Sequence, residues 1–401
     1  MKTTEKISDR VLNMEESATL KMAGLARALR AAGKEVISLS LGEPDFDTPD
    51  HIKEAAKKAL DDGYTKYTPV PGLLELRKAI SNKFKRDNNL DYSENQIVVS
   101  NGAKQSLANL SLSLLNPGDE VIILAPYWVS YFEIVRLSGA KPIIIETDIS
   151  QDFKASPAQL QAALTDKTRF ILFSSPCNPT GSVYTQSDLE ALAAVIKDRE
   201  DILVVADEIY EYINFTDKHF SIGSIPYLKD RTITVNGFSK GYAMTGWRLG
   251  YIGAPEWVAK ACIKIQGQVT SGANAFAQKA AAYALEAPMD ASNKMKATYL
   301  KRKELIMDLL SQIDGMQVNH PTGAFYIFPD ISALLGKSYQ GQKIETDEDF
   351  SALILNEAHV AVVPGSAFGC KGCIRISYAA SDAEIIEACK RIKTYVEQLE
   401  G

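Results

Sequence analysis

Residues 232–240 read Thr-Ile-Thr-Val-Asn-Gly-Phe-Ser-Lys, a short β-branched run that leads into a turn and ends at a lysine. Similar apolar runs recur along the chain, at residues 97–100, 121–124, 143–145, 169–173 and 202–206. Segments with helical periodicity separate them, and we expect helices at 50–60, 74–85 and 103–115. Apolar strands that alternate with helices are typical of a mostly parallel sheet with both faces covered. The sequence therefore predicts a doubly wound α/β fold.

The pattern changes after about residue 290. We expect a long basic helix at 294–310, a hairpin-like segment at 323–328, a helix at 347–358, strands at 360–363 and 373–378, and a closing helix from 382. Five basic side chains are interpreted as a solvated helix face: Lys294, Lys296, Lys301, Arg302 and Lys303. We expect a large domain at 50–290 and a smaller α+β domain formed by both chain ends, 1–49 and 291–401.

Composition limits the function. The 401 residues include 44 Lys and Arg and 50 Asp and Glu, so the net charge is −6. Nucleic-acid binders usually carry a basic surface instead. No apolar run approaches the roughly 18 residues of a membrane span, and the polar N-terminus lacks the apolar core of a secretory signal. We expect a cytoplasmic protein that binds neither nucleic acid nor membrane.

The five cysteines and four histidines show no metal-binding pattern. The cysteines are sparse and scattered, unlike a disulfide framework, and the histidines lack zinc-site spacing. Cys370 and Cys373 form a C-x-x-C pair without a helix N-terminus after a strand and without a second ligand pair. We interpret both as buried or idle thiols and predict no metal site.

Chemically distinctive residues follow four of the expected strands. A glycine turn at Asn101–Lys104 opens a helix and offers backbone N–H groups to a phosphate. Asn178, Asp207 and Lys240 each follow another strand. Any one of these turns is also compatible with an ordinary connection, but ligands bind at the carboxyl ends of parallel strands. A lysine for an imine, a carboxylate for a pyridinium nitrogen and a phosphate seat are what pyridoxal phosphate requires. Arg248 is a candidate phosphate clamp.

Five segments resemble class I aminotransferases, in that family's order. They are Gly42–Pro49, Pro126–Tyr131, Ser175–Gly181, Asp207–Tyr210 and Gly237–Gly250. The last is similar to the family's lysine-attachment motif. The likeness is greatest to the bacterial and plastidic aspartate aminotransferase branch and extends from about residue 10 to the C-terminus. It implies fold type I, pyridoxal 5'-phosphate as cofactor, and a homodimer with a shared active site.

The resemblance implies a role for each residue around the cofactor ring. Lys240 would hold the cofactor covalently and move a proton between the substrate and the cofactor. Asp207 would keep the pyridine nitrogen protonated. Tyr210 and Asn178 would bind the phenolic oxygen, and Trp128 would stack on the ring.

The same resemblance places the phosphate. Backbone groups around Ala103 and Lys104 would hold it together with Arg248, and Tyr67 would reach it from the neighbouring subunit. Many relatives carry a serine at the position of Gly237. One side-chain contact to the phosphate is therefore absent from this chain.

Substrate contacts are also implied by the resemblance. Arg375 would anchor the α-carboxylate with Asn178 and the backbone of Gly42, beside Trp128. From the sequence alone, Arg375 could equally lie on the solvated face of a strand. A planar guanidinium matched to a carboxylate gives a physical reason for arginine at an anchor.

The distal end of the substrate defines the expected specificity. In the resembling branch, residues at the positions of Lys104 and Thr19 help to bind a second carboxylate, which favours aspartate and glutamate. Relatives that accept prephenate tend to carry a basic residue where this chain has Glu15. We therefore expect ping-pong transfer from L-aspartate to 2-oxoglutarate, without efficient use of prephenate.

Other functions remain open at this point. A same-class enzyme could prefer prephenate with glutamate, aromatic substrates or alanine. Gly237-Phe-Ser239-Lys-Gly241 formally matches the G-x-S-x-G of serine hydrolases, with His320 or His359 downstream. This reading leaves Asp207 unexplained. A non-catalytic cofactor-binding regulator is the third alternative.

Overall fold

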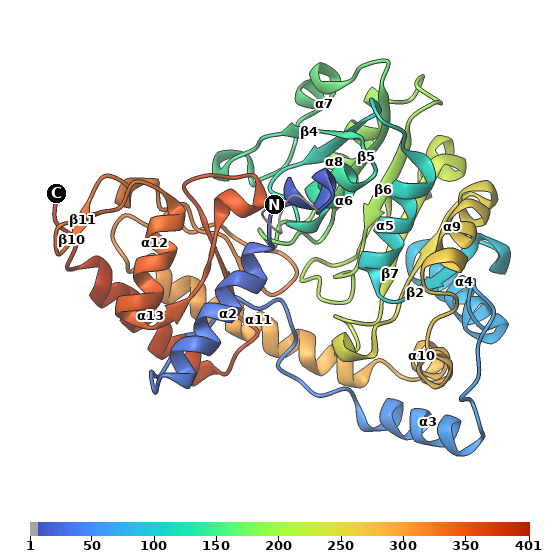
Figure 1. Cartoon of the computed structure of the whole chain (residues 1–401), viewed down its shortest axis with the longest axis horizontal. Helices are drawn as coiled ribbons and strands as arrows, with labels where there is room; N and C mark the ends of the chain where they lie inside the picture. The colour runs from blue at the N-terminus through green and yellow to red at the C-terminus, as the bar shows by residue number, and fades with distance from the viewer. Residues whose placement is uncertain (1–6) are drawn as a thin grey trace.

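A seven-stranded sheet organises the larger part of the molecule (Figure 1). The computed structural model describes residues 7–401; residues 1–6, assigned above to the small domain, lie outside the described residues. The strands are β2 (Ile97–Ser100), β3 (Glu120–Leu124), β4 (Lys141–Ile145), β5 (Thr168–Ser174), β6 (Leu203–Asp207), β7 (Thr232–Gly237) and β8 (Gly250–Gly253). Their order is β2-β8-β7-β6-β5-β3-β4. Neighbouring strands are parallel, except that β8 is antiparallel to both of its neighbours, β2 and β7. The predicted mostly parallel α/β sheet is confirmed; the short, glycine-bounded β8 was not predicted.

Helices cover both faces of this sheet, which is why its strands are mostly apolar and buried. Along β3, Val121 and Ile123 pack into one core cluster, whereas Ile122 and Leu124 pack into another. The first cluster includes α5 (Ala103–Leu114), α6 (Ser130–Leu137) and α9 (Glu256–Val269). The second includes α7 (Pro157–Ala163) and α8 (Gln186–Val195). A third joins α3 (Asp50–Asp61), α4 (Leu74–Asn88) and α10 (Ala275–Glu286).

The chain ends meet in the smaller part. It contains α2 (Ala18–Ala31), β1 (Ile37–Ser38), α11 (Asp290–Ser311), β9 (Tyr326–Ile327), β10 (Ser338–Tyr339), β11 (Gln342–Lys343), α12 (Asp347–Leu353), β12 (Val360–Ala361), β13 (Val363–Pro364), β14 (Ile374–Ser377) and α13 (Asp382–Val396). The short helix α1 (Asp9–Leu12) instead lies beside α6 of the larger part, where both line one surface cavity. β1 pairs in parallel with β12, and Met22 and Ala26 of α2 pack with Leu355 and Ala361. On these contacts we propose the domain division at 1–49 with 291–401.

Two expectations for the C-terminal part were wrong. Residues 323–328 form no hairpin, because β9 pairs with β14, about fifty residues downstream. The basic helix face is not uniformly solvated: Arg302 and Lys303 are only 8% and 5% exposed. Arg302 forms ion pairs with two other segments, with Nη1 2.8 Å from Asp45 and Nε 3.1 Å from Asp382. Periodicity identifies a helix, but distant segments decide which of its faces are covered.

One predicted helix changes form before its end. The 347–358 segment is α-helical through Leu353 and continues as a π-helical turn through Ala358. The left-handed backbone of His359 (φ 56°) then terminates it. In residues 7–401, no helix combines the length and apolar character needed to cross a membrane.

Candidate active site

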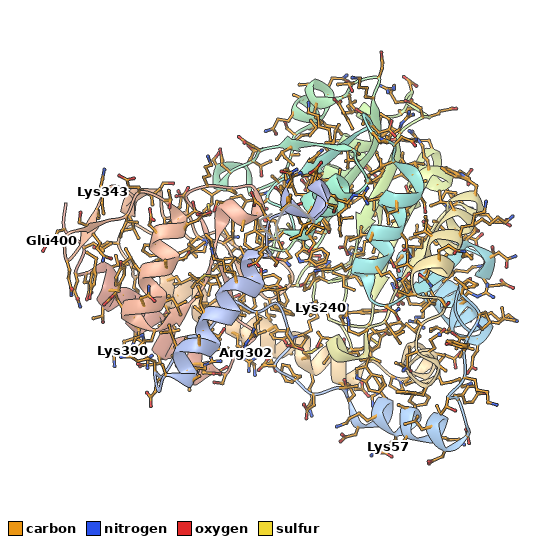
Figure 2. The ribbon with its side chains drawn as sticks, viewed as in Figure 1. Lys57, Lys240, Arg302, Lys343, Lys390 and Glu400 are labelled. Atoms are coloured by element: carbon orange, nitrogen blue, oxygen red, sulfur yellow. The ribbon has the colours of Figure 1, made fainter. Side chains whose placement is uncertain are left out.

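One cavity of about 380 Å³ brings together residues from the large sheet, the N-terminal segment and β14. The predicted site residues that line it are Thr19, Gly42, Ala103, Lys104, Trp128, Asn178, Asp207, Tyr210, Lys240, Arg248 and Arg375. Figure 2 shows Lys240 in the interior, between the two parts of the molecule. Tyr67 is the exception, because it lies outside this cavity and is 99% exposed.

Lys240 follows β7 and its amine reaches the N-terminal segment. Its Nζ donates a hydrogen bond to the Gly42 carbonyl. Burial lowers its pKa to about 8, with Arg375 and Arg248 acting in the same direction and Glu43 against it. A buried ammonium loses hydration, so the neutral amine is favoured. Lys240 therefore has a nucleophilic form accessible near neutral pH.

Asp207 lies at the end of β6 and is buried. Its Oδ2 accepts a 2.7 Å hydrogen bond from the Tyr131 hydroxyl, and its Oδ1 accepts one from the Ile209 backbone N–H at 3.2 Å. Burial raises its pKa to about 6, although both hydrogen bonds oppose the shift. A buried carboxylate with this pKa gains from a cationic partner. Tyr131 was missed as a site residue; it lies three positions after Trp128, on α6.

Arg375 is 1% exposed, so the alternative of a solvated strand face does not hold. Its Nη1 donates to Asn178 Oδ1 at 2.9 Å and its Nη2 to the Ser40 carbonyl at 2.5 Å. The guanidinium carbon lies 4.6 Å from the ring centroid of Tyr326, whose hydroxyl shares a 2.6 Å hydrogen bond with Tyr210. Arg375 Nε has no partner among the described residues. The guanidinium therefore keeps one N–H that no described protein group satisfies. Sequence reasoning missed Tyr326.

The N-terminus of α5 and Arg248 together form a binding site for an anion. Gly102 has φ 86°, and a Cβ there would lie 2.5 Å from Arg248 Nη2. A Cβ at Gly250 would lie 2.2 Å from the Ala103 amide nitrogen. Both glycines are therefore needed for this close approach. Free amides, a helix N-terminus and a guanidinium together suit a phosphate.

Gly237 lies where β7 and β8 approach each other closely. A Cβ at Gly237 would lie 3.0 Å from Gly250 Cα, from the Leu249 carbonyl oxygen and from Ile209 Cδ1. Two of these three atoms belong to the backbone of β8 or the residue before it, and a side chain at position 237 would require them to move by a few tenths of an ångström. The glycine thus allows the close pairing of β7 with β8.

These observations fit pyridoxal phosphate. Lys240 offers the amine, Asp207 offers a carboxylate in need of a cation, and the turn at Gly102 with Arg248 offers the phosphate seat. Trp128 lines the same cavity. Its ring centroid lies 4.8 Å from Lys104 Nζ. The part of the chain that would hold the cofactor is therefore assembled within one subunit, apart from Tyr67.

The lowered pKa of Lys240 gives a pH prediction. We expect the rate at which the cofactor-free protein captures pyridoxal phosphate to rise about tenfold per pH unit up to pH 8, and then to level off. Below the pKa of about 8 the amine is protonated and cannot attack. Stopped-flow absorbance measures the rate, with Nα-acetyl-lysine, whose amine has the ordinary pKa near 10.5, as reference. A protein rate that keeps pace with the reference to pH 10 would contradict the shift.

A buried polar network surrounds Glu208, the residue that follows Asp207. Ligand atoms of Glu208, Glu211 and His219 lie within 4.8 Å of one another, a grouping that sequence spacing did not reveal. Lys83 pairs with Glu211 and donates to Asn88 Oδ1 at 2.6 Å, while Asn88 donates to Glu211 at 2.7 Å. The Lys83 ammonium thus supplies positive charge within the cluster. We interpret the network as a structural support for the end of β6.

Breaking this network has a large expected cost. We expect Lys83→Met to lower the free energy of unfolding by about 3 kcal/mol, because it leaves Glu211 buried without its partner. Both side chains are at most 3% exposed. The control is Lys57→Met, which removes an exposed pair with Glu54 and should change stability by less than about 1 kcal/mol. Urea denaturation measures both; equal losses would contradict the prediction.

The chain is similar to known proteins over nearly its whole length, in sequence and in structure. Residues 34–392 match the family model of aminotransferase class I and II. The chain is 47% identical over 392 residues to a probable aspartate/prephenate aminotransferase of Rhizobium leguminosarum bv. phaseoli, covering 97% of this chain and 98% of that protein. The crystal structure of the Rhizobium meliloti aspartate aminotransferase has a TM-score of 0.95, with 43% identity over 98% of this chain and 100% of that one. The Thermus thermophilus aspartate aminotransferase with maleate has a TM-score of 0.91, with 40% identity over 97% and 99%.

Proposed function

This chain belongs to the aminotransferase class I and II family, and we propose that it transfers the amino group of L-aspartate to 2-oxoglutarate, giving oxaloacetate and L-glutamate. It is a pyridoxal-phosphate-dependent enzyme. When bound, the cofactor accepts the electrons released at the substrate Cα. The observation that carries the proposal is that Lys240 shares one cavity with Arg375 and Asn178 and also with Lys104 and Thr19.

Two cations from different elements favour a dicarboxylate substrate. Arg375 on β14 binds the α-carboxylate together with Asn178. The hydrogen bonds from its guanidinium to Asn178 and to the Ser40 carbonyl fix the orientation of the group. Lys104 at the start of α5 and Thr19 on α2 bind the second carboxylate. Names of relatives are consistent with this chemistry, since one structure is an aspartate aminotransferase with maleate, itself a dicarboxylate.

The proton moves through Lys240. Its lowered pKa makes the neutral amine available to take the proton from the substrate Cα, and the ammonium so formed would pass that proton on to the cofactor. Asp207 would stabilise positive charge on the ring nitrogen, with Tyr131 holding the carboxylate in place. Tyr210 and Asn178 would hold the phenolic oxygen, and Trp128 would orient the ring.

The complete site requires a second copy of the chain. Tyr67 is 99% exposed and outside the cavity of its own subunit, and we propose that it binds the cofactor phosphate of its partner. The enzyme works in the cytoplasm as this homodimer.

A half-reaction screen tests the function. Single amino acids are added to the purified holoenzyme, and the visible absorbance of the bound cofactor is followed. We expect aspartate and glutamate to react fastest and alanine and aromatic amino acids slowly. A fast reaction with aromatic amino acids alone, or no reaction with aspartate, would overturn the proposal.

Prephenate is the second candidate acceptor, because the Rhizobium leguminosarum relative is named for it. Glu15, which is exposed, leads us to expect weak use of prephenate. Adding prephenate to the amino form of the enzyme decides the question. Ser239 lines the cavity, but none of the cavity's lining residues in the described chain is a histidine, so the hydrolase alternative lacks its base. Labelling of Ser239 by a fluorophosphonate would revive it.

Arg375→Lys tests the substrate anchor. We expect kcat/KM for aspartate to fall about 100-fold, mainly through KM, because an ammonium cannot reproduce the two-pronged contact of the guanidinium. Steady-state kinetics with varied aspartate separate KM from kcat. Arg391→Lys, at a partly exposed helical ion pair with Glu387, is the matched control and should leave both constants unchanged. An unchanged KM for Arg375→Lys would remove Arg375 from this role.

A further inference from the structure

Cys370 and Cys373 face each other across a tight turn. Their Sγ atoms lie 3.7 Å apart, and Gly372 supplies the left-handed backbone of the turn at φ 74°. A disulfide bond measures about 2.05 Å, so less than about 2 Å of approach would close it. The interpretation of both residues as idle thiols did not anticipate this contact, because sequence spacing alone does not define how two thiols are oriented.

The two thiols differ in access. Cys370 is half-buried, whereas Cys373 is 2% exposed. Lys371, between them, is exposed, so this side of the turn faces solvent. An oxidant from solvent therefore meets Cys370 first, and Cys373 is positioned to resolve the product. The other cysteines, Cys177, Cys262 and Cys389, are all buried.

The turn is connected to the substrate anchor. The Cys373 carbonyl accepts a 2.8 Å hydrogen bond from the Gly365 N–H, and the Gly365 carbonyl accepts one from Cys370 at 3.1 Å. Between these residues lies Phe368, whose ring centroid is 4.9 Å from the Arg375 guanidinium carbon. Cys373 itself precedes β14, which carries Arg375. A movement of the turn must therefore be transmitted to the packing around Arg375.

The loop at residues 365–370 also packs closely against Tyr127. The Phe368 carbonyl accepts a 3.0 Å hydrogen bond from the Tyr127 N–H, next to Trp128. A Cβ at Gly369 would lie 2.5 Å from the Tyr127 ring, which shows how tightly the loop packs there. Because close-packed interiors transmit strain, the loop cannot absorb a new covalent bond without a shift near the site.

We propose that Cys370 and Cys373 form a reversible oxidation site that weakens carboxylate binding at Arg375 when it is closed. The oxidant class is a low-molecular-weight disulfide, such as glutathione disulfide. The Cys370 thiolate attacks one sulfur and releases one glutathione thiol; Cys373 then displaces the second glutathione, forms the Cys370–Cys373 bond and loses its proton. Two protein thiols are oxidised and one small disulfide is reduced to two thiols. The role of Arg375 rests on the proposed function, whereas the thiol chemistry does not.

The test uses holoenzyme equilibrated in glutathione redox buffers. Peptide mass spectrometry after alkylation should show the loss of two hydrogen atoms in the peptide that carries both cysteines. The Kd for maleate, measured by calorimetry, should rise about tenfold, or about 1.4 kcal/mol, and dithiothreitol should restore it. Cys373→Ser should retain one glutathione on Cys370, and Cys370→Ser should show neither modification nor a change in Kd.

Two results would overturn the proposal: a pair that stays reduced in oxidising buffers, or a disulfide that leaves the maleate Kd unchanged. Failure of the proposed function would look different. A holoenzyme that binds maleate with redox-dependent affinity but does not react with aspartate would contradict the aspartate assignment and leave the oxidation site standing.

Discussion

Lys240→Ala lowers aspartate turnover by more than about 10⁴-fold, the largest effect we expect from any single substitution. General acid–base catalysis by a positioned side chain contributes about 10²- to 10⁴-fold, and Lys240 also attaches the cofactor. Its amine is prepared for both tasks, because burial lowers its pKa to about 8 and its hydrogen bond to the Gly42 carbonyl keeps it in the cavity. Coupled assay of oxaloacetate measures the loss.

Covalent attachment provides a second measurement, independent of turnover. Borohydride reduction should fix the cofactor to the wild-type protein and not to Lys240→Ala. Lys260→Ala, at an exposed helical ion pair with Glu256, is the control and should behave as the wild type in both measurements. If Lys240→Ala retained wild-type turnover, Lys240 would lose its proposed role.

Asp207→Asn is expected to lower kcat by about 10³-fold. The substitution preserves the shape of the side chain but removes the negative charge that favours a protonated ring nitrogen. Removal of one preorganised electrostatic group typically costs about 10²- to 10³-fold in kcat, and Asp207 is buried, where screening by water is weak. Single-turnover absorbance with excess aspartate measures the chemical step directly.

Tyr131→Phe is the matched control for that substitution. It removes the 2.7 Å hydrogen bond to Asp207 Oδ2 and keeps the carboxylate. A hydrogen bond to a charged group contributes about 1.5–3 kcal/mol, so we expect a loss of at most about 100-fold, smaller than for Asp207→Asn. The reverse order would show that the hydrogen bond, and not the charge, is what the reaction needs.

Local sequence was sufficient to predict those features of the fold that a single helix or strand encodes by itself. The apolar runs that precede Asn101, Asp207 and Lys240 predicted a mostly parallel sheet, and the sheet is mostly parallel. The short β8 was missed because four residues between glycines carry little periodicity. The hairpin expected at 323–328 was wrong because the partner of β9 is β14, and only folding brings those segments together.

The candidate site shows the same difference between what local motifs predict and what depends on long-range packing. Motifs in order along the chain pointed to Lys240, Asp207 and Asn178, and the structure places all three around one cavity. Tyr326, which holds Tyr210 and lies over Arg375, had no motif of its own. Its role depends on β9 lying beside β14, a relation that no local pattern encodes.

The sequence by itself determined the fold class, the family resemblance and the chemistry expected of Lys240, because these depend on residue types at short spacing. Only the tertiary structure decided that Arg375 is buried rather than solvated, that Arg302 is clamped between Asp45 and Asp382, and that Cys370 and Cys373 lie 3.7 Å apart. The physical reason is that burial, ion pairing and thiol contact are properties of pairs of surfaces. Those surfaces come from distant parts of the chain and exist only after packing has brought them together.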